Sequence, residues 1–477
     1  MAETHSTPKP SRWSDLAEKA HLAYSVLFAG SVALHAVNVF ISITIMPTVV
    51  RDIGGLGLYA WSSTVFIASS ILSAALTSQL LGLLGIKGAY ISAVGIFILG
   101  TTLCAAAPDI WTLILGRAIQ GGGGGFFYAL SYAVIRLVYP KPLWPLAIGL
   151  ISAMWGVATL LGPAIGGVFA QIQAWRMAFW VLIPFATAIG GLALISLPSK
   201  RVAHDRTNVI PFAQLLLLLL IVLSVSIGSI NTTVVKAIFA LVMVVIFGGA
   251  LVFFDRTLTA RLLPAGSFSL KSSLGARYLY VALIILAMQV EIFVPFFLIR
   301  LHGLLPIWAG FIGAFMALGW TAGSMLTANW QGPKVRVLLQ LGPLICAMGL
   351  LLQGLFLPQL SDGHWINLAP ICFGLLGIGF GIGVSWPHIV VQIYNCAPTK
   401  EHDLAAGGIT TVQLFATAFG AALAGMVVNL AGLSNTISPL EQTQAASALC
   451  LTFLAFPIAC VFVARGFSNV PKRKSNS

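Results

Sequence analysis

Charged residues are scarce in this chain. They make up 8% of its 477 residues, whereas hydrophobic residues make up 58%. Soluble domains average about a quarter charged residues, so this composition is too apolar for a water-facing surface. The stretch 209–228 contains no charged residue, and about 20 apolar residues suffice to cross the hydrocarbon core as a helix. The alternating pattern of barrel strands is missing, so the sequence predicts a helical protein embedded in the lipid bilayer.

The chain also lacks the motifs of catalysis and of cofactor binding. Its six cysteines are scattered without C-x-x-C spacing, which excludes a disulfide framework and a thiolate metal site. There is no G-x-x-x-x-G-K-[ST] phosphate loop, no G-x-S-x-G and no H-E-x-x-H. We therefore expect no cofactor, no metal and no ATP-driven step, and the protein is not predicted to be an enzyme.

Long apolar runs predict an all-α polytopic membrane protein with about fourteen spans, whose ends are uncertain by a few residues. The expected spans are 22–48, 59–83, 89–107, 110–137, 144–171, 176–197, 209–228, 235–254, 275–302, 305–329, 335–357, 367–394, 405–431 and 446–466.

Basic residues are distributed unequally between the two ends of these spans. The net charge is +13, which on a soluble protein would suggest a nucleic-acid partner. About twenty Lys and Arg residues lie in segments or span ends on the side of the termini, and only Arg117 falls in the interior of a span, which makes it the only base predicted to be buried. On the other side lie only Arg51, Arg176, Lys236 and Arg300. The positive-inside rule therefore predicts that both termini are cytoplasmic, and no nucleic-acid partner is expected.

Two segments of the chain resemble each other across its halves. Trp61 precedes Gly85 at the same spacing at which Trp308 precedes Gly332, and "GPAIGG" (162–167) matches "GAALAG" (420–425). Parallel repeats of this kind are typical of transporters with a central site and alternating access. The expected organisation is a cytoplasmic segment 1–21, a six-helix half 22–197, a linker with two extra helices 198–274, a second six-helix half 275–466 and a basic tail 467–477.

Acidic residues number only twelve, and Glu291 alone lies deep within a span. Intramembrane acids are costly and usually functional, so Glu291 is the predicted proton-coupling residue. Pro295 lacks an N–H for the carbonyl of Glu291 and predicts a kink there. Gln289, the other polar residue nearby, is expected to line the substrate cavity. The alternative is a structural acid that is hydrogen-bonded to a neighbouring helix or paired with Arg117.

Polar residues also form a stripe on each of two predicted helices. The first stripe falls on one face of the first span, where a cavity rather than lipid is expected. Its histidine titrates near neutrality when unperturbed and is the second proton-carrier candidate; the alternative is a satisfied core histidine. The first stripe consists of Ser31, His35, Asn38 and Ser42, and the second, also expected to line the cavity, of Thr410, Gln413 and Thr417.

Three further motifs carry a resemblance to a known family. "LILGRAIQGGGGG" (113–125) and "GVATLLGPAIGG" (156–167), followed by "WRMAFW" (175–180), resemble the fourth-, fifth- and sixth-helix motifs of the major facilitator superfamily, in its fourteen-helix drug:proton antiporter branch. The resemblance implies conformational or relay roles for the motif residues Arg117, Gln120, Gly121, Gly123, Gly156, Gly162, Pro163, Gly166 and Gly167. Pro295 joins this conformational set because of its kink.

The chain departs from that family at three positions. Gly82 and Asn329 stand where the loop motif normally has an acid, which puts the usual charged gating latch in doubt. Asn38 stands where the first helix often has an aspartate. An amide cannot release a proton, so the usual first-helix titrating group is missing.

The sequence therefore predicts a monomeric secondary transporter of a bacterial cytoplasmic membrane that exports lipophilic or amphiphilic small molecules in exchange for protons. An uncoupled or differently coupled carrier of an amphiphilic metabolite or lipid is the alternative. A membrane scaffold or receptor is a more distant one, because it would need a motif or soluble face that the chain lacks.

Overall fold

The computed structural model describes residues 13–199, 211–230, 233–258, 260–269, 271–327, 330, 332–398, 401–433 and 438–467. These residues form helices joined by short connections, and no strand occurs among them. Asn329, most of the predicted segment 1–21 and nearly all of the tail 467–477 lie outside the described residues.

The N-terminal half is a bundle built around α2. Its apolar helices pack their buried faces on one another, because only the bilayer-facing surface can remain apolar and exposed. The elements are α1 Trp13–Leu16, α2 Lys19–Ile53, η1 Leu56–Leu58, α3 Trp61–Ala105, α4 Ile110–Val138, η2 Lys141–Leu143, α5 Trp144–Gln171, α6 Trp175–Trp180 and α7 Leu182–Ser196.

Two of the expected spans are joined within α3 without a loop. The reversal occurs at Gly85, whose φ of 72° lies in the left-handed region that glycine adopts most readily. Phe66, before the glycine, and Phe97, after it, both lie against the glycine run of α4, at Gly121 and Gly123. The two parts of α3 therefore lie side by side along α4, as two crossings of the membrane.

The C-terminal half follows two inserted helices. The inserted pair is α8 Phe212–Gly228 and α9 Val234–Thr257. The C-terminal elements are α10 Ser273–Ala287, η3 Met288–Ile292, α11 Val294–Leu301, α12 Pro306–Gly313, α13 Phe315–Thr327, α14 Pro333–Phe356, α15 Trp365–Cys396, α16 His402–Leu430 and α17 Pro439–Arg465.

Eleven helices among the described residues are long and apolar enough to span a membrane, and α8 is a shorter apolar helix. One of the eleven spans includes both crossings of α3. α4 is a long helix that is not among these eleven spans, and it carries five consecutive glycines together with Arg117 and Gln120. The all-α polytopic fold is therefore confirmed, and the helix number is compatible with the about fourteen spans expected.

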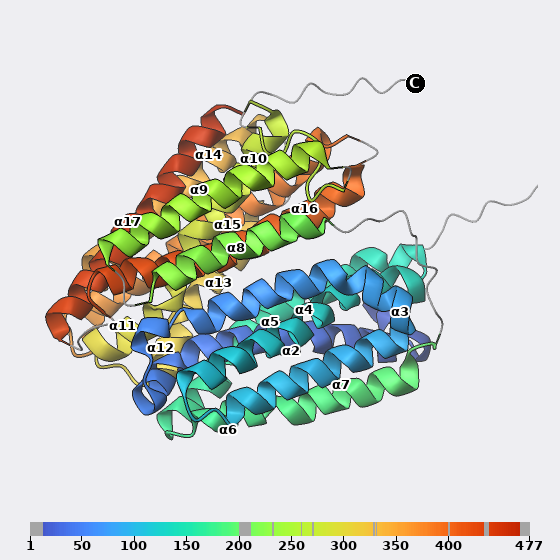
Figure 1. Ribbon diagram of the computed structural model, residues 1–477, viewed down its shortest axis with the longest axis horizontal. Helices are drawn as coiled ribbons and strands as arrows, with labels where there is room; N and C mark the ends of the chain where they lie inside the picture. Colours follow the sequence, from blue (N-terminus) through green and yellow to red (C-terminus); the bar gives the residue numbers. More distant parts are fainter. Residues whose placement is uncertain are drawn as a thin grey trace, which may run out of the picture.

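The two halves are related by matching contacts at their interface. Gly167 of α5 faces the backbone of Ile307, so that an added Cβ would lie 2.6 Å from its Cα atom. Gly425 of α16 likewise faces Ala60, so that a Cβ added to Gly425 would lie 2.8 Å from the Cβ of Ala60. These four residues are equivalent positions of the two sequence matches, so the internal repeat is expressed as a symmetric interface. Figure 1 shows the N-terminal half below and the C-terminal half above, meeting near α12.

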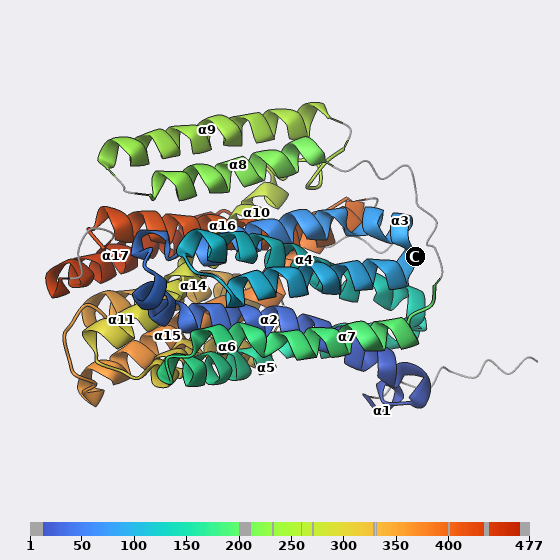
Figure 2. The ribbon, with the colours of Figure 1, turned by 60° about the horizontal axis from the view of Figure 1, so that its bottom comes forward.

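The inserted helices lie outside this two-half arrangement. α8 packs against α16 and α3, and α9 packs mainly against α8. Figure 2 shows the pair lying along one side of the molecule. Much of the α9 surface is exposed and apolar, including Val245 and Phe253, as expected for a helix surrounded by lipid.

Candidate functional site

The two halves are in contact at the end opposite the termini, called here the closed end. Tyr59, between η1 and α3, stacks on Phe293 with ring centroids 4.7 Å apart, and its edge faces Phe296 at 5.7 Å. Tyr59 is 2% exposed and Phe293 is 1% exposed. An aromatic cluster from both halves therefore excludes water at this end.

Hydrogen bonds reinforce the closed end beside the aromatic cluster. The side-chain amide of Asn429 in α16 donates to the carbonyl of Gly57 at 2.7 Å and to that of Ser229 at 2.8 Å. Trp61 donates its indole N–H to the carbonyl of Ser226 at 3.0 Å. One asparagine thus ties together the N-terminal half, the inserted helices and the C-terminal half.

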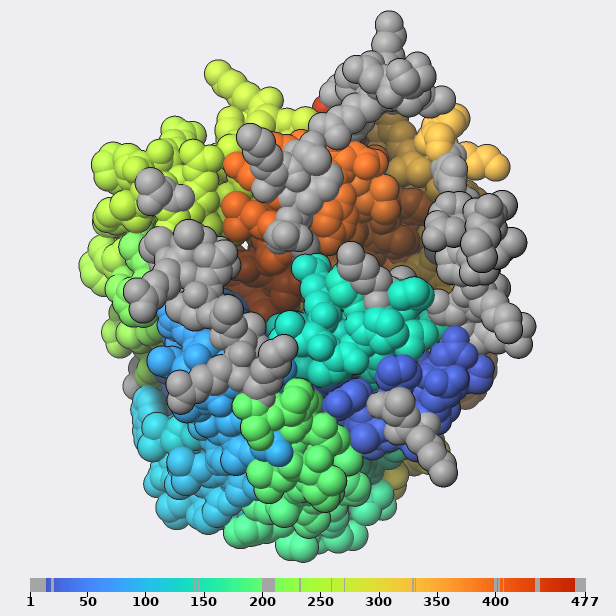
Figure 3. Space-filling view, turned by 90° about the vertical axis from the view of Figure 1, so that its right-hand side faces the viewer, coloured from blue at the N-terminus to red at the C-terminus, as the bar shows by residue number. Residues whose placement is uncertain are grey.

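The halves are separated at the other end, where both termini lie. Figure 3 looks at this end and shows the surface recessed between the orange helices of the C-terminal half and the teal and blue helices of the N-terminal half. Closure at one end and a recess at the other is the geometry of one state of an alternating-access cycle.

Arg117 lies inside the N-terminal half, where it is 1% exposed. Its guanidinium donates to the side-chain oxygens of Gln120 at 2.6 Å and Asn38 at 3.3 Å, and its Nε donates to the carbonyl of Ser62 at 3.2 Å. It also lies over the ring of Phe66, 4.1 Å from the centroid. No carboxylate pairs with it among the described residues, so this buried cation is held by neutral acceptors.

His35 lies one turn before Asn38 in α2 and is 5% exposed. Its ring stacks on the Phe66 ring at 5.3 Å and is flanked by Tyr128 at 5.8 Å and Trp155 at 6.1 Å. Among the described residues its Nδ1 has no hydrogen-bond partner. Phe66 therefore contacts both the Arg117 guanidinium and the His35 imidazole, which places the two basic groups in one cluster.

The remaining residues of the first stripe are buried among α2, α3 and α4. Ser31 donates to the carbonyl of Leu27, and Ser42 lies 3.1 Å from the hydroxyl of Ser62. Both are 2% exposed or less. The predicted stripe therefore faces the interior of the N-terminal half, and contact of these residues with substrate stays a prediction.

Three neighbouring membrane crossings, α2 and the two parts of α3, pack closely on the glycine run of α4. A Cβ on Gly121 would overlap the backbone of Phe66, and one on Gly123 would overlap the backbone of Phe97. A Cβ on Gly124 would lie 2.7 Å from Nδ1 of His35. The run thus allows α2 and both crossings of α3 to approach α4 closely, as small residues do in membrane helix packing.

The predicted α5 motif divides into packing positions and one open position. A Cβ on Gly162 would overlap the side chain of Phe40, and one on Gly166 would lie 3.1 Å from the carbonyl oxygen of Ile41. Pro163 approaches Gly310 of α12 across the interface, and Gly156 has no neighbour within 4 Å of an added Cβ. Gly162, Gly166 and Gly167, three of the four motif glycines, therefore set how closely α5 approaches α2 and the opposite half.

Glu291 lies where the first helix of the C-terminal half is interrupted. The 3-10 segment η3 separates α10 from α11, which accords with Pro295 removing one backbone donor. Glu291 is half-buried, and no ion pair involves it among the described residues. Gln289 is 2% exposed, donates to the carbonyl of Ile285 and packs against Gly420 of α16. The interruption thus places an unpaired carboxyl two residues before Phe293 of the closed end.

The second polar stripe lies on α16. Thr410, Gln413 and Thr417 are each half-buried, and the hydroxyl of Thr417 donates to the carbonyl of Gln413. Their lining of the cavity stays a prediction.

The prediction that Arg117 is the only buried base is wrong. Arg277, one turn into α10, is also 1% exposed. It donates to Gln392 at 2.9 Å and to the carbonyl of Ser273 at 2.7 Å, and it lies over the Phe467 ring. Sequence placed Arg277 at a span end, where arginines usually reach water; packing of α10 against α15 and α17 buries it instead.

The aromatic pair at the closed end was also missed. Tyr59 and Phe293 lie in apolar surroundings that resemble any other membrane helix, and only the approach of two distant segments reveals their contact. The sole sequence signal was the position of Tyr59 two residues before the repeated Trp61.

Comparison with known proteins agrees with this arrangement. Residues 28–421 match the family model described as Major Facilitator Superfamily. The chain is 36% identical over 443 residues to a probable multidrug-efflux transporter of Mycobacterium tuberculosis (strain ATCC 25618 / H37Rv), covering 90% of this chain and 92% of that protein. It is 34% identical over 167 residues to a dehydrocurvularin exporter of Alternaria cinerariae, covering 35% of this chain and 29% of the exporter.

Solved structures show the same fold at low sequence identity. A POT family transporter in complex with 5-aminolevulinic acid superposes with a TM-score of 0.65 and 16% identity, covering 93% of this chain and 96% of that one. A nucleoside transporter superposes with a TM-score of 0.63 and 11% identity, covering 94% of this chain and 100% of that one. Because the family model spans most of the chain and the mycobacterial relative matches nearly all of it, the chain belongs to the major facilitator superfamily.

Proposed function

We propose that this membrane transporter exports lipophilic or amphiphilic small molecules by alternating access, in exchange for protons. The observation that carries the proposal is the contact of Tyr59 with Phe293, which closes one end while the halves are separated at the other. As a member of the superfamily the chain is a transporter of small molecules rather than an enzyme.

The substrate class follows from the scarcity of charge within the bundle. Glu291 is the only acid predicted deep in a span, and Arg117 is enclosed by Asn38, Gln120 and Phe66. Such a pathway offers few partners for a highly charged solute and favours neutral or weakly cationic lipophilic compounds. The relatives named as a probable multidrug-efflux transporter and as an exporter support the same class.

The direction of the recess follows from the distribution of basic residues. The positive-inside rule places the termini, and with them the recessed end, in the cytoplasm. We therefore propose that the recess belongs to an inward-facing state, which takes substrate from the cytoplasm or the inner leaflet. We propose that the protein works as a monomer in a bacterial cytoplasmic membrane, since both halves of the pathway come from one chain.

Glu291 is the proposed proton-coupling group. It is half-buried at a helix interruption, and no ion pair involves it in the described part of the chain. Discontinuous helices of this kind commonly bear the coupling sites of secondary transporters. Phe293, two residues further on, belongs to the closed end. A change in charge at Glu291 therefore acts beside a contact that must break when the transporter opens outward.

His35 is the second proposed titrating group. Its ring shares Phe66 with Arg117, and its Nδ1 has no hydrogen-bond partner in the part of the chain that the structure describes. A proton that enters or leaves this cluster changes the charge beside a buried guanidinium, which provides a route by which the N-terminal half can respond to protonation.

The test is transport into proteoliposomes with an imposed pH gradient and a fluorescent lipophilic cation as probe. Wild type is expected to accumulate the probe in an acidic lumen, whereas Glu291→Gln is expected to equilibrate it without accumulation. Glu441→Gln, a change at an acid near the start of α17, is the matched control and should accumulate like wild type. If wild type ignores the gradient, the antiporter proposal fails; if Glu291→Gln still accumulates the probe, Glu291 is not the coupling acid.

One observation favours the alternative of an uncoupled or differently coupled carrier. Asn38, the position at which the family often has an acid, binds Arg117 with a neutral amide. A wild-type protein that equilibrates an amphiphilic metabolite or lipid without regard to pH would support that alternative.

A further inference from the structure

A pocket lies outside the transport pathway, between the inserted helix α9 and the start of α16. It has a volume of about 440 Å³ and is lined by Arg256, Thr257, Leu258, Arg261, Glu401 and Leu404. It lies at the end of the molecule that carries the termini, where α9 reaches the membrane surface. We propose that this pocket binds the phosphate headgroup of an anionic phospholipid.

The loop that carries Arg261 is held in place by three hydrogen bonds. Gln214 of α8 donates to the carbonyl of Ala260 at 2.7 Å. Asp255 accepts from the backbone N–H of Leu262 at 3.3 Å, and Glu401 accepts from that of Ala265 at 2.9 Å. Arg261 therefore projects from a loop that follows α9 and is fixed by hydrogen bonds to α8, α9 and Glu401.

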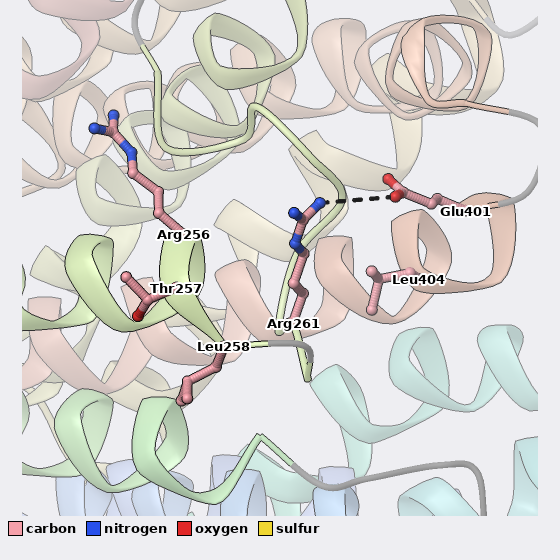
Figure 4. A pocket seen from close by; sticks show the side chains of 6 residues that line it. All are labelled: Arg256, Thr257, Leu258, Arg261, Glu401 and Leu404. Atoms are coloured by element: carbon pink, nitrogen blue, oxygen red, sulfur yellow. Dashed lines mark ion pairs between the residues drawn. The ribbon is translucent and has the colours of Figure 1, made fainter.

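The charge of the pocket is incompletely neutralised. Arg261 approaches Glu401 at 4.0 Å, with side chains 38% and 28% exposed. Exposed pairs of this kind contribute little. Arg256 pairs with no acid among the described residues. Figure 4 shows Arg261 extended toward Glu401, whereas the exposed side chain of Arg256 points away from this pair, so that Arg261 is the arginine that faces Glu401 across the pocket. Guanidinium groups bind phosphate oxygens through paired N–H donors, so this pocket complements a phosphate.

The surface beside the pocket suits an acyl chain. Phe253 and Val245 of α9 are 62% and 74% exposed, and Leu258 and Leu404 contribute apolar walls to the pocket itself. A headgroup at the arginines would let its acyl chains run along the exposed face of α9. Basic residues at the membrane surface attract anionic lipids, so a phospholipid fits both the charge and the apolar face.

A lipid at this site would act on the interface between the halves. Glu401 precedes the first turn of α16, and α16 packs against α3 of the N-terminal half. A phosphate on Arg261 competes with Glu401 and thereby weakens the contact between the loop and the start of α16, leaving the hydrogen bond from the Ala265 N–H to Glu401. The proposed site thus gives the inserted helix α9 a role in binding membrane lipid beside α16.

The test is native mass spectrometry of the purified full-length protein with added phosphatidylglycerol or phosphatidylcholine. Wild type is expected to retain phosphatidylglycerol in preference to phosphatidylcholine. Arg256→Gln should weaken that binding about five-fold, and Arg256→Gln with Arg261→Gln about thirty-fold. Arg336→Gln, at an exposed arginine near the start of α14, is the matched control and should bind like wild type.

Glu401→Gln provides a test of opposite sign. Removal of the competing carboxylate should tighten phosphatidylglycerol binding, an effect that a damaged fold does not produce. The proposal is overturned if wild type does not distinguish the two lipids, if Arg256→Gln binds like wild type, or if millimolar inorganic phosphate displaces the lipid. The last result would identify a site for a soluble anion.

Discussion

Asn38 accepts a hydrogen bond from the guanidinium of Arg117 at 3.3 Å, inside the N-terminal half. The amide oxygen is one of three neutral acceptors around a cation that is 1% exposed. A buried cation is costly unless it is hydrogen-bonded. Asn38 cannot release a proton, unlike the acid that is common at this position. It nevertheless has a structural function, because its amide oxygen accepts a hydrogen bond from the buried Arg117.

Replacement of Asn38 should reveal that function. Asn38→Leu removes an acceptor from a buried charge and is expected to destabilise the protein by about 1.5–3 kcal/mol. Asn38→Asp keeps an acceptor, now charged, and should unfold at a temperature no lower than wild type. The measurement is the thermal unfolding midpoint of the purified protein in detergent. An Asn38→Leu protein as stable as wild type would show that Arg117 does not depend on this amide.

Loss of the Tyr59 ring should open the closed end. Tyr59→Ala removes two aromatic contacts, each about 0.5–1.5 kcal/mol, and should shift the population toward the outward-open state. Spin labels at Ile172 and Leu360, which are 61% and 64% exposed at the closed end, should report longer distances. Tyr59→Phe keeps the rings and removes a hydroxyl without a partner, so it should stay closed. Equal distances in Tyr59→Ala and wild type would contradict the aromatic closure.

Adjacent glycines of α4 should respond differently to a single methyl group. In Gly123→Ala the new Cβ overlaps the backbone of Phe97, and the variant should lose folded protein at expression. In Gly122→Ala the nearest atom is 3.5 Å away, and alanine favours a helix over glycine by up to about 1 kcal/mol. That variant should be as stable as wild type or more so. The yield of monodisperse protein and its unfolding midpoint measure both, and similar values for the two variants would refute the packing argument.

His302, just beyond α11, should make the protein less stable in acid. Burial lowers the pKa of His302, while the hydrogen bond to the Leu357 carbonyl partly raises it. Since the folded pKa lies below the unfolded value of about 6.5, the unfolded state takes up the proton first and stability falls as the pH drops through that value. His302→Gln should reduce this fall between pH 7.5 and pH 5 in thermal unfolding, whereas a change at exposed His364 should not. An unchanged pH profile in His302→Gln would exclude His302 as the source.

The membrane fold was predictable because it depends on properties that local sequence carries. Apolar runs without charge leave a helix as the only spanning solution, and the repeated tryptophan and glycine spacings identified two equivalent halves. Gly167 against Ile307 and Gly425 against Ala60 are the structural counterpart of that repeat. The interruption near Glu291 followed from the covalent chemistry of Pro295, which acts within a single turn.

Tertiary structure alone decided how these elements meet. Five consecutive glycines of α4 look equivalent in the sequence. Only the close approach of a neighbouring helix makes Gly123 intolerant of a Cβ where Gly122 is not. Arg277 was buried by helices more than a hundred residues away, and Tyr59 met Phe293 across the two halves. Composition and the repeated tryptophan–glycine spacing therefore determined that the chain spans the membrane as two related helical bundles. Burial of charge and closure of one end depend on contacts between segments distant in the chain, which no local pattern records.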